Sequence, residues 1–260
     1  MRILSVVGAR PQFIKAAPLS AEVRQYHDEY LVHTGQHYDD AMSKVFFQQL
    51  GIPEPDINLG VGGGSHAEQT ARIMIALEKV IEQQQPEWML VYGDTNSTLA
   101  AALAAAKVHL PIMHVEAGLR SYNRAMPEEI NRVLTDHLSR RLFCPTPIAV
   151  ANLAREGITA GVVQTGDIMV DAVLKYVVIA RQEASIHTTM NLSPDTPYAA
   201  VTIHRPANTD TPETLSEILA ALNRLPLPVV FPVHPRFPDN VIRLIAAAGI
   251  LAAARPFLQV

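Results

Sequence analysis

The sequence predicts an α/β protein with doubly wound parallel sheets, and two observations support this fold class. Short apolar segments alternate along the chain with longer segments whose apolar residues recur at helical spacing. The short segments are apolar almost throughout, which is typical of parallel strands that helices cover on both faces. A domain boundary is expected either at Thr165–Asp167 or in the polar stretch Ser185–Pro197, and we place the domains at 1–166 and 167–260.

The first domain is expected to contain strands that each end in a polar or glycine-containing turn. They cover Ile3–Val7, Tyr30–His33, Trp88–Tyr92, Ile112–Val115, Leu142–Cys144 and Val162–Gln164. Helical spacing predicts helices over Phe13–Gln25, Asp39–Leu50, Ser65–Gln84, Thr95–Lys107, Glu128–Ser139 and Pro147–Glu156. Ser65 and Glu68 match a capping box at one helix start, and Pro86 ends that helix.

The second domain opens with a helix over Ile168–Glu183, and the alternation restarts beyond residue 197. Strands are expected over Tyr198–Ile203 and Val229–Val233, and helices over Pro212–Leu225 and Asn240–Ala248. Sheets of this class usually have four or more strands. The second domain is therefore expected to be incomplete.

Composition narrows the functional class. The chain has 260 residues, 48% of them apolar, and its mean hydropathy of +0.12 excludes disorder as a description of the whole chain. The net charge of −4 and the isoelectric point near 6.2 exclude a dedicated nucleic-acid binder. No apolar run reaches the length of a membrane span, no signal peptide is recognised, and Cys144 is the single cysteine. We therefore expect a cytoplasmic protein.

Polar residues follow the expected strands repeatedly. In open parallel sheets, ligands bind beyond the carboxyl ends of the strands, so these residues predict one long cleft shared by the two domains. They are Arg10, Gln36, His37, Asp94, His114 and Glu116 in the first domain, and His204, Arg205, His234 and Arg236 in the second. Asp94 equally fits a helix N-cap, and Glu128 suits a helix N-terminus through the macrodipole alone, until Asn131 and Arg132 join it.

Cations in this cleft point to an anionic ligand. Arg10 and Lys15 flank a strand-to-helix turn whose free amides are expected to face a phosphate group, and Arg205 and Arg236 are expected to face them from the second domain. Asp94, Glu116 and Glu128 would then supply carboxylates for proton transfer. No paired-cysteine, zincin, Walker or dinucleotide pattern occurs, so we expect neither a metal nor a cofactor.

The sequence resembles the non-hydrolysing UDP-N-acetylglucosamine 2-epimerases. The resemblance rests on the segments Gly8–Lys15, Thr34–His37, Gly93–Thr95, His114–Arg120, Pro127–Arg132 and His204–Arg205, in the order of the family. It implies two Rossmann-like domains of the glycosyltransferase-B type with the substrate between them, and typically a homodimer. It also implies interconversion of UDP-N-acetylglucosamine and UDP-N-acetylmannosamine, the latter for surface polysaccharide synthesis.

The resemblance also assigns roles to residues. It implies that Asp94, Glu116 and Glu128 act as acid and base, and that His204 lies at the diphosphate of UDP. It places Arg10 and Lys15 at the nucleotide site. The remaining candidates for substrate binding are Gln36, His37, Asn131, Arg132, Arg205 and His234. In the family, UDP is eliminated across C1–C2 to give 2-acetamidoglucal and is then added back with C2 inverted.

Two departures from the family leave alternatives open. Ala207 stands where the family has an acidic residue, and the later Ser-Gly-Gly turn that holds UDP does not occur, so a C-terminally truncated chain is expected. The alternatives are a non-catalytic sugar-nucleotide-binding or dimerisation module, and a hydrolysing epimerase that releases UDP and N-acetylmannosamine. A glycosyltransferase of the same fold explains three carboxylates less well, because transfer needs one base at most.

Overall fold

The structure is a computed structural model that describes residues 1–36, 47, 50–183, 186–203, 206–209, 211–232 and 251–253. The chain divides into two compact units, Met1–Ile179 and Ala180–Val260. Most of the helix expected over Asp39–Leu50, and all of that over Asn240–Ala248, lies outside the described residues. In the part of the chain that is described, no helix is both long and apolar enough to cross a membrane.

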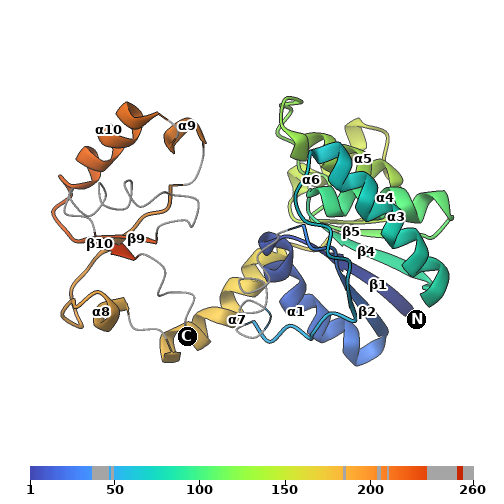
Figure 1. Cartoon of the computed structure of the whole chain (residues 1–260), viewed down its shortest axis with the longest axis horizontal. Helices are drawn as coiled ribbons and strands as arrows, with labels where there is room; N and C mark the ends of the chain where they lie inside the picture. The colour runs from blue at the N-terminus through green and yellow to red at the C-terminus, as the bar shows by residue number, and fades with distance from the viewer. Residues whose placement is uncertain are drawn as a thin grey trace. The chain divides into compact units, whose positions relative to one another are not determined.

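The first unit is built on a seven-stranded sheet in the order β3-β2-β1-β4-β5-β6-β7 (Figure 1). Every neighbouring pair is parallel. The strands are β1 (Arg2–Val7), β2 (Asp28–His33), β3 (Ile57–Asn58), β4 (Trp88–Tyr92), β5 (Ile112–Val115), β6 (Arg141–Cys144) and β7 (Val162–Gln164). The strand order reverses between β1 and β4, so the turns that follow these two strands flank the switch point where such sheets bind ligands.

Helices cover both faces of this sheet, which confirms the doubly wound class. They are α1 (Arg10–Tyr26), α3 (His66–Gln84), α4 (Asn96–Lys107), α5 (Pro127–Leu138), α6 (Pro147–Arg155) and α7 (Ile168–Glu183). α1 and α7 lie on one face, and α3, α4, α5 and α6 lie on the other (Figure 1). Alternate residues of β1 serve the two cores: Leu4 and Val6 pack with α3 and α4, whereas Ile3 and Val7 pack with α1.

α7 belongs largely to the first unit. Ile168 and Tyr176 pack against the core on the α1 face, and Tyr176 Oη donates to the Leu50 carbonyl oxygen at 2.6 Å. The division of the chain into compact units falls within α7, between residues 179 and 180.

The second unit contains a three-stranded parallel sheet in the order β10-β9-β8. Its elements are α8 (Ile186–Thr189), β8 (Ala199–Ala200), α9 (Pro206–Thr209), α10 (Pro212–Leu222), β9 (Val229–Pro232) and β10 (Leu251–Ala253). Leu215 and Leu219 of α10 pack with Val229 and Phe231 of β9. Parallel sheets with helices in both units confirm the predicted α/β class.

The element boundaries differ from expectation in places. α1 begins at Arg10 instead of Phe13, because Pro11 is favourable in a first helical turn. The strand expected over Tyr198–Ile203 is confined to Ala199–Ala200, although the Val201 amide still donates to the Val230 carbonyl oxygen at 2.9 Å. β3, α8, α9 and β10 were not predicted, and each has four residues or fewer, too few to show a periodicity.

Candidate functional site

The Gln12 side chain forms hydrogen bonds to the chain on both sides of the switch point. Its Oε1 accepts hydrogen bonds from the amides of Gly8 and Ala9 at 2.9 and 3.1 Å. Its Nε2 donates to the Tyr92 carbonyl oxygen and to Thr98 Oγ1, both at 3.0 Å. The side chain is buried, with an exposed fraction of 1%. We expected the amides of this turn to be free to face a ligand, but those of Gly8 and Ala9 are already bonded to the Gln12 side chain.

The Gln36 side chain likewise forms hydrogen bonds within the protein, at the first turn of α4. Its Oε1 accepts from the Ser97 amide at 3.0 Å and from Ser97 Oγ at 2.6 Å. Ser97 Oγ also lies 2.8 Å from Thr34 Oγ1, and a Cβ on Gly8 would lie 2.0 Å from that same Thr34 oxygen. The structure therefore gives the Gln36 carbonyl oxygen, which we expected at a substrate, a role in capping α4.

Glu116 lies directly after β5 and pairs with Lys15. The Lys15 Nζ and Glu116 Oε2 atoms are 2.5 Å apart, and both side chains are largely buried. The backbone of Glu116 is left-handed, with φ of +73°, a conformation that costs an ordinary residue about 1–2 kcal/mol. A Cβ on Gly93 would lie 3.0 Å from Lys15 Nζ. The ammonium group of Lys15 therefore lies between the ends of β4 and β5.

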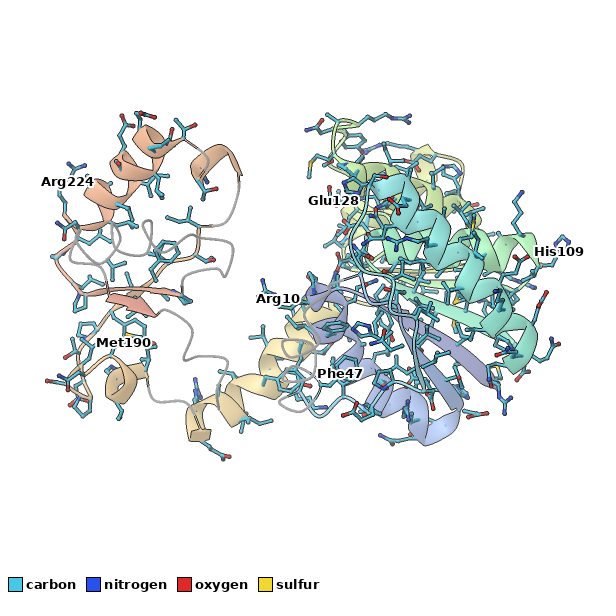
Figure 2. All side chains as sticks on the ribbon, in the orientation of Figure 1. Arg10, Phe47, His109, Glu128, Met190 and Arg224 are labelled. Carbon is cyan, nitrogen blue, oxygen red and sulfur yellow. The ribbon has the colours of Figure 1, made fainter. Side chains whose placement is uncertain are left out.

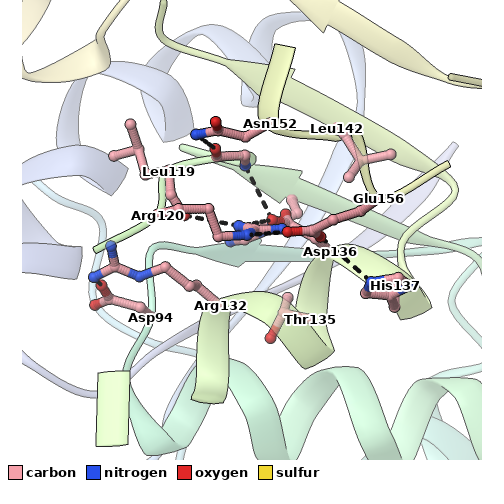
Figure 3. Close-up of polar contacts among 12 residues, drawn as sticks. Asp94, Leu119, Arg120, Arg132, Thr135, Asp136, His137, Leu142, Asn152 and Glu156 are labelled. Atoms are coloured by element: carbon pink, nitrogen blue, oxygen red, sulfur yellow. Dashed lines mark hydrogen bonds and ion pairs between the residues drawn. The ribbon is translucent and has the colours of Figure 1, made fainter. Parts of the chain in front are cut away.

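Asp94 lies after β4 and forms an ion pair with Arg132 of α5 (Figure 3). Asn131 Nδ2 donates to the Asp94 carbonyl oxygen at 2.9 Å, so Asn131 and Arg132, two of the α5 residues that the sequence singled out, contact this loop. The N-cap of α4 is Thr95, whose side chain accepts from the Thr98 amide at 3.3 Å. The alternative reading of Asp94 as a helix cap is therefore wrong.

The adjacent acids at the start of α5 differ in their surroundings. Glu129 is buried and accepts hydrogen bonds from the Ser121 amide, from Ser121 Oγ and from the Tyr122 amide at 2.8–3.0 Å. Burial alone would raise the pKa of Glu129, but these hydrogen bonds and the charge of Arg132 outweigh it and hold the pKa below its usual value. Glu128 is exposed, and it precedes Arg132 by one helical turn on the same face of α5.

Asp136 is the centre of a buried polar network behind these loops (Figure 3). Its Oδ1 lies 2.7 Å from His114 Nδ1. Its Oδ2 accepts from the Gly118 amide at 3.0 Å and from Arg120 Nη1 at 2.6 Å. The other ring nitrogen of His114, Nε2, lies 2.8 Å from the Gly93 carbonyl oxygen.

Arg120 links this centre to Glu156 of the loop that follows α6. Its Nε and Nη2 atoms donate to the two carboxylate oxygens of Glu156, each at 2.7 Å. Hydrogen bonding by Arg120 lowers the pKa of Glu156. Burial would raise the pKa of Asp136, but His114 and Arg120 outweigh it and lower that pKa. Sequence reasoning missed Asp136 and Glu156, and the single signal pointing to them was His114 near the end of an apolar strand.

Of the remaining predicted residues, the structure describes Arg10 and leaves the others outside its described ranges. Arg10 is exposed in the first turn of α1, and Figure 2 shows it with Glu128 at one end of the first unit, opposite His109. The residues outside the described ranges are His37, His204, Arg205, His234 and Arg236. Within the described ranges, no cluster of His, Cys, Asp and Glu side chains could hold a metal ion.

Glu116 also lines a pocket of about 220 Å³ at the carboxyl ends of β5, β6 and β7. Val115, Phe143 and Ile168 contribute apolar walls, while Asp167 adds a carboxylate. Two carboxylates, Asp94 and Glu116, therefore follow neighbouring strands, each with its own cation. This arrangement suits proton transfer without a metal, because ionised carboxylates accept protons and their acids return them.

The chain is similar to known sugar-nucleotide epimerases. The family profile described as UDP-N-acetylglucosamine 2-epimerase matches residues 21–257. A UDP-N-acetylglucosamine 2-epimerase homologue of Methanococcus maripaludis is 49% identical over 91% of this chain and 66% of its own length. The UDP-2,3-diacetamido-2,3-dideoxy-D-glucuronate 2-epimerase of Pseudomonas aeruginosa is 48% identical over 94% of this chain and 70% of its own length. The chain thus spans about two thirds of the length of these curated relatives.

Solved structures show the same fold. The Methanocaldococcus jannaschii UDP-GlcNAc 2-epimerase in complex with UDP-GlcNAc and UDP superposes with a TM-score of 0.82 at 38% identity, covering 95% of this chain and 69% of that one. MnaA of S. aureus with UDP gives a TM-score of 0.83 at 33% identity, covering 96% and 68%. From its profile match, its relatives and its fold, this chain belongs to the UDP-N-acetylglucosamine 2-epimerase family.

Proposed function

We propose that the protein interconverts UDP-N-acetylglucosamine and UDP-N-acetylmannosamine by the non-hydrolysing route. The observation that carries the proposal is the pair of carboxylates, Asp94 and Glu116, which follow the neighbouring strands β4 and β5 at the carboxyl edge of the sheet. Each carboxylate is only partly exposed and is paired with a cation. A solved relative of the same fold was crystallised with UDP-GlcNAc and UDP.

The proposed chemistry follows from the substrate. No carbonyl group adjoins C2 of the sugar to acidify its proton, so direct removal and return of that proton is unfavourable. In the proposed route, one carboxylate takes the C2 proton while the C1–O bond breaks, and the C–H electron pair becomes the C1=C2 bond of 2-acetamidoglucal. UDP then adds back to C1 as a carboxylic acid protonates C2 from the opposite face. The atoms balance without a redox cofactor or a metal.

The cations give this route its electrostatic support. Lys15 and Arg132 form ion pairs with Glu116 and Asp94, the carboxylates proposed to exchange protons with the sugar. Arg10, exposed at the same end of the unit as Glu128, is proposed to attract the departing diphosphate. Glu128 is proposed as a further acid or base, and the assignment of each carboxylate to one face of the sugar stays open.

A second candidate substrate is a UDP-2,3-diacetamido-2,3-dideoxy-D-glucuronate. The P. aeruginosa enzyme named for this substrate is 48% identical to the chain, whereas the named UDP-N-acetylglucosamine 2-epimerases of M. maripaludis and M. jannaschii are each 41% identical. Both reactions invert C2 next to a UDP-bearing C1, so the same carboxylates serve either. The two substrates differ at C3 and C6, which lie away from the reacting bonds.

Proton exchange with solvent tests the proposal. The purified chain is incubated in D₂O with each sugar nucleotide, and NMR follows deuterium at C2 while chromatography separates the products. The expected result is C2 deuterium in both epimers of one sugar nucleotide. Release of free N-acetylmannosamine would identify a hydrolysing enzyme instead. UDP binding by calorimetry without C2 deuterium would identify a non-catalytic binding module and overturn the proposal. A homodimer is also proposed, and sedimentation velocity tests it.

A further inference from the structure

The buried network around Asp136 has no direct part in the proton transfers proposed above. Asp136 and His114 have exposed fractions of 0%, so a substrate reaches neither of them. The two oxygens of Asp136 nevertheless hold separate partners: Oδ1 holds the His114 ring, and Oδ2 holds the Gly118 amide and Arg120. Any effect of Asp136 on the reaction must therefore pass through these neighbours.

The hydrogen bonds of His114 define its protonation. Its Nε2 faces the Gly93 carbonyl oxygen at 2.8 Å, and a carbonyl oxygen only accepts. Its Nδ1 faces Asp136 at 2.7 Å, and Asp136 is ionised because His114 and Arg120 hold its pKa below the usual value. Both ring nitrogens therefore donate, and the ring is an imidazolium. The charges of the network balance, since Glu156 pairs with Arg120 and Asp136 pairs with His114.

This network holds both loops that carry the candidate carboxylates. The His114 ring binds the carbonyl oxygen of Gly93, the residue directly before Asp94. Asp136 binds the amide of Gly118, which follows Glu116 by two residues. One buried carboxylate is thus connected to the β4 loop through the imidazolium ring and to the β5 loop directly.

We propose that Asp136, acting through the imidazolium of His114, is a positioning residue that sets Asp94 and Glu116 at the separation required for proton transfer at C2. The inference rests on the proposed function and deepens it. We call two hydrogen bonds the loop tethers: the one between His114 and the Gly93 carbonyl oxygen, and the one between the Gly118 amide and Asp136. Because a misplacement of about 1 Å lowers an enzymatic rate by about 100-fold, these two bonds suffice to control the reaction.

Two substitutions of Asp136 distinguish positioning from charge. In Asp136→Asn, the new Oδ1 accepts from Gly118 and Arg120, and Nδ2 donates to Nδ1 of a neutral ring whose Nε2–H still donates to Gly93. All tethers survive and the network stays electrically balanced. Asp136→Ala removes both tethers. We expect Asp136→Ala to lower kcat for C2 deuterium exchange by about 100-fold with KM changed less than about threefold, and Asp136→Asn to restore the rate to within about tenfold of the original.

Further variants keep the test valid if Asp136→Ala fails to fold. His114→Leu removes only the Gly93 tether and leaves the Asp136–Arg120 pair, and we expect kcat to fall by at least about tenfold. Glu156→Gln is the matched control, because it alters the same network without touching either loop tether, and its kcat should equal that of the original chain. Rates of Asp136→Ala and His114→Leu within about threefold of the original, or a Glu156→Gln rate as low as theirs, would overturn the proposal.

An NMR measurement that needs no turnover separates this inference from the proposed function. In the chain labelled with ¹⁵N-histidine, His114 should show two ring N–H signals, and in Asp136→Asn it should show one. In His114→Leu and Asp136→Ala, the Asp94 amide shift should change, and Asp136→Ala should also shift Glu116. If the original chain turns over neither sugar nucleotide, the proposed function fails while these signals still decide the positioning. A single N–H on His114, or unchanged shifts of both carboxylate residues, would overturn it.

Discussion

Asp94 in the loop after β4 and Glu116 in the loop after β5 both pair with a cation, but different forces hold the two loops. Asp94 is held by α5: Arg132 pairs with its carboxylate, and Asn131 Nδ2 donates to its backbone carbonyl oxygen. Glu116 is constrained by its own backbone, which is left-handed and whose amide donates to the Phe143 carbonyl oxygen at 3.1 Å. Substitutions elsewhere should therefore disturb Asp94 through α5 and Glu116 through its immediate chain neighbours.

The largest expected effect comes from neutralising the carboxylates themselves. Glu116→Gln and Asp94→Asn should each lower C2 deuterium exchange by about 10²–10⁴-fold, because an amide neither accepts nor returns the proton. NMR of the recovered sugar nucleotide measures the rate. Glu82→Gln, an exposed acid of α3, is the control and should exchange at the original rate. If one of the two loop variants kept near-original exchange, that carboxylate would have no part in the proton transfer.

The next effect compares a glycine from each loop. Gly118 has φ of +80°, and a Cβ there would lie 2.4 Å from the Ala149 carbonyl oxygen, so Gly118→Ala combines backbone strain with overlap against rigid backbone. We expect a loss of about 2–4 kcal/mol in the free energy of unfolding.

Gly93→Ala is the matched substitution in the other loop. Its Cβ would meet only Lys15 Nζ, a side-chain end instead of rigid backbone, at 3.0 Å, so we expect a loss of about 1–2 kcal/mol, mainly from its φ of +62°. Urea unfolding of both variants measures the difference. An equal loss in the two would contradict the view that the β5 loop is the more tightly packed.

A smaller effect is expected from the partner of Asp94. Arg132→Met keeps the apolar stem but removes the ion pair, so we expect exchange to fall by about tenfold because Asp94 is no longer oriented. The free energy of unfolding should fall by only about 1 kcal/mol, since the pair is partly exposed. Arg132→Lys should recover part of the exchange rate. If Arg132→Met retained the original rate, Asp94 would have to be held by its backbone, as Glu116 is.

The smallest expected effect is a loss of stability at acidic pH, caused by protonation of Glu129. The folded-state pKa of Glu129 is lowered below its unfolded value near 4.3, so its stabilisation is present above that value and is lost as pH falls through the folded pKa. Urea unfolding at about pH 7, 5, 4 and 3 should show stability falling towards acid by at most ~1.4 kcal/mol per pH unit for this group. Glu129→Gln should be less stable at neutral pH and should lose less on acidification. Parallel pH profiles would exclude Glu129 as a contributor.

Local patterns were sufficient to predict the sheet and the strand-end positions of Asp94 and Glu116. Continuously apolar strands and helical spacing can be recognised from the sequence alone. The carboxyl ends of parallel strands then necessarily lie at the same edge of the sheet. The partners were not predictable in this way. Gln36 looks like a ligand-binding amide in sequence, and its capping of α4 depends on Ser97, which is distant along the chain.

Buried charge was the least predictable feature. Asp136 occurs in a helix where a polar residue ordinarily indicates the solvent face, and its burial requires His114, Gly118 and Arg120 to meet it from other segments. Glu128 and Glu129 are chemically alike and adjacent, so only the path of the preceding loop determines that Glu129 is buried and Glu128 exposed.

The hydrogen bonds of Gln12 bear on the conformational entropy that is lost when a ligand binds. Because a single side-chain amide binds the turns after β1 and β4, the rim of the sheet at this point behaves as one rigid piece. A molecule that docks on one turn finds the other already in place, so little conformational entropy is lost on binding. We therefore expect Gln12 to contribute to affinity without contacting the ligand.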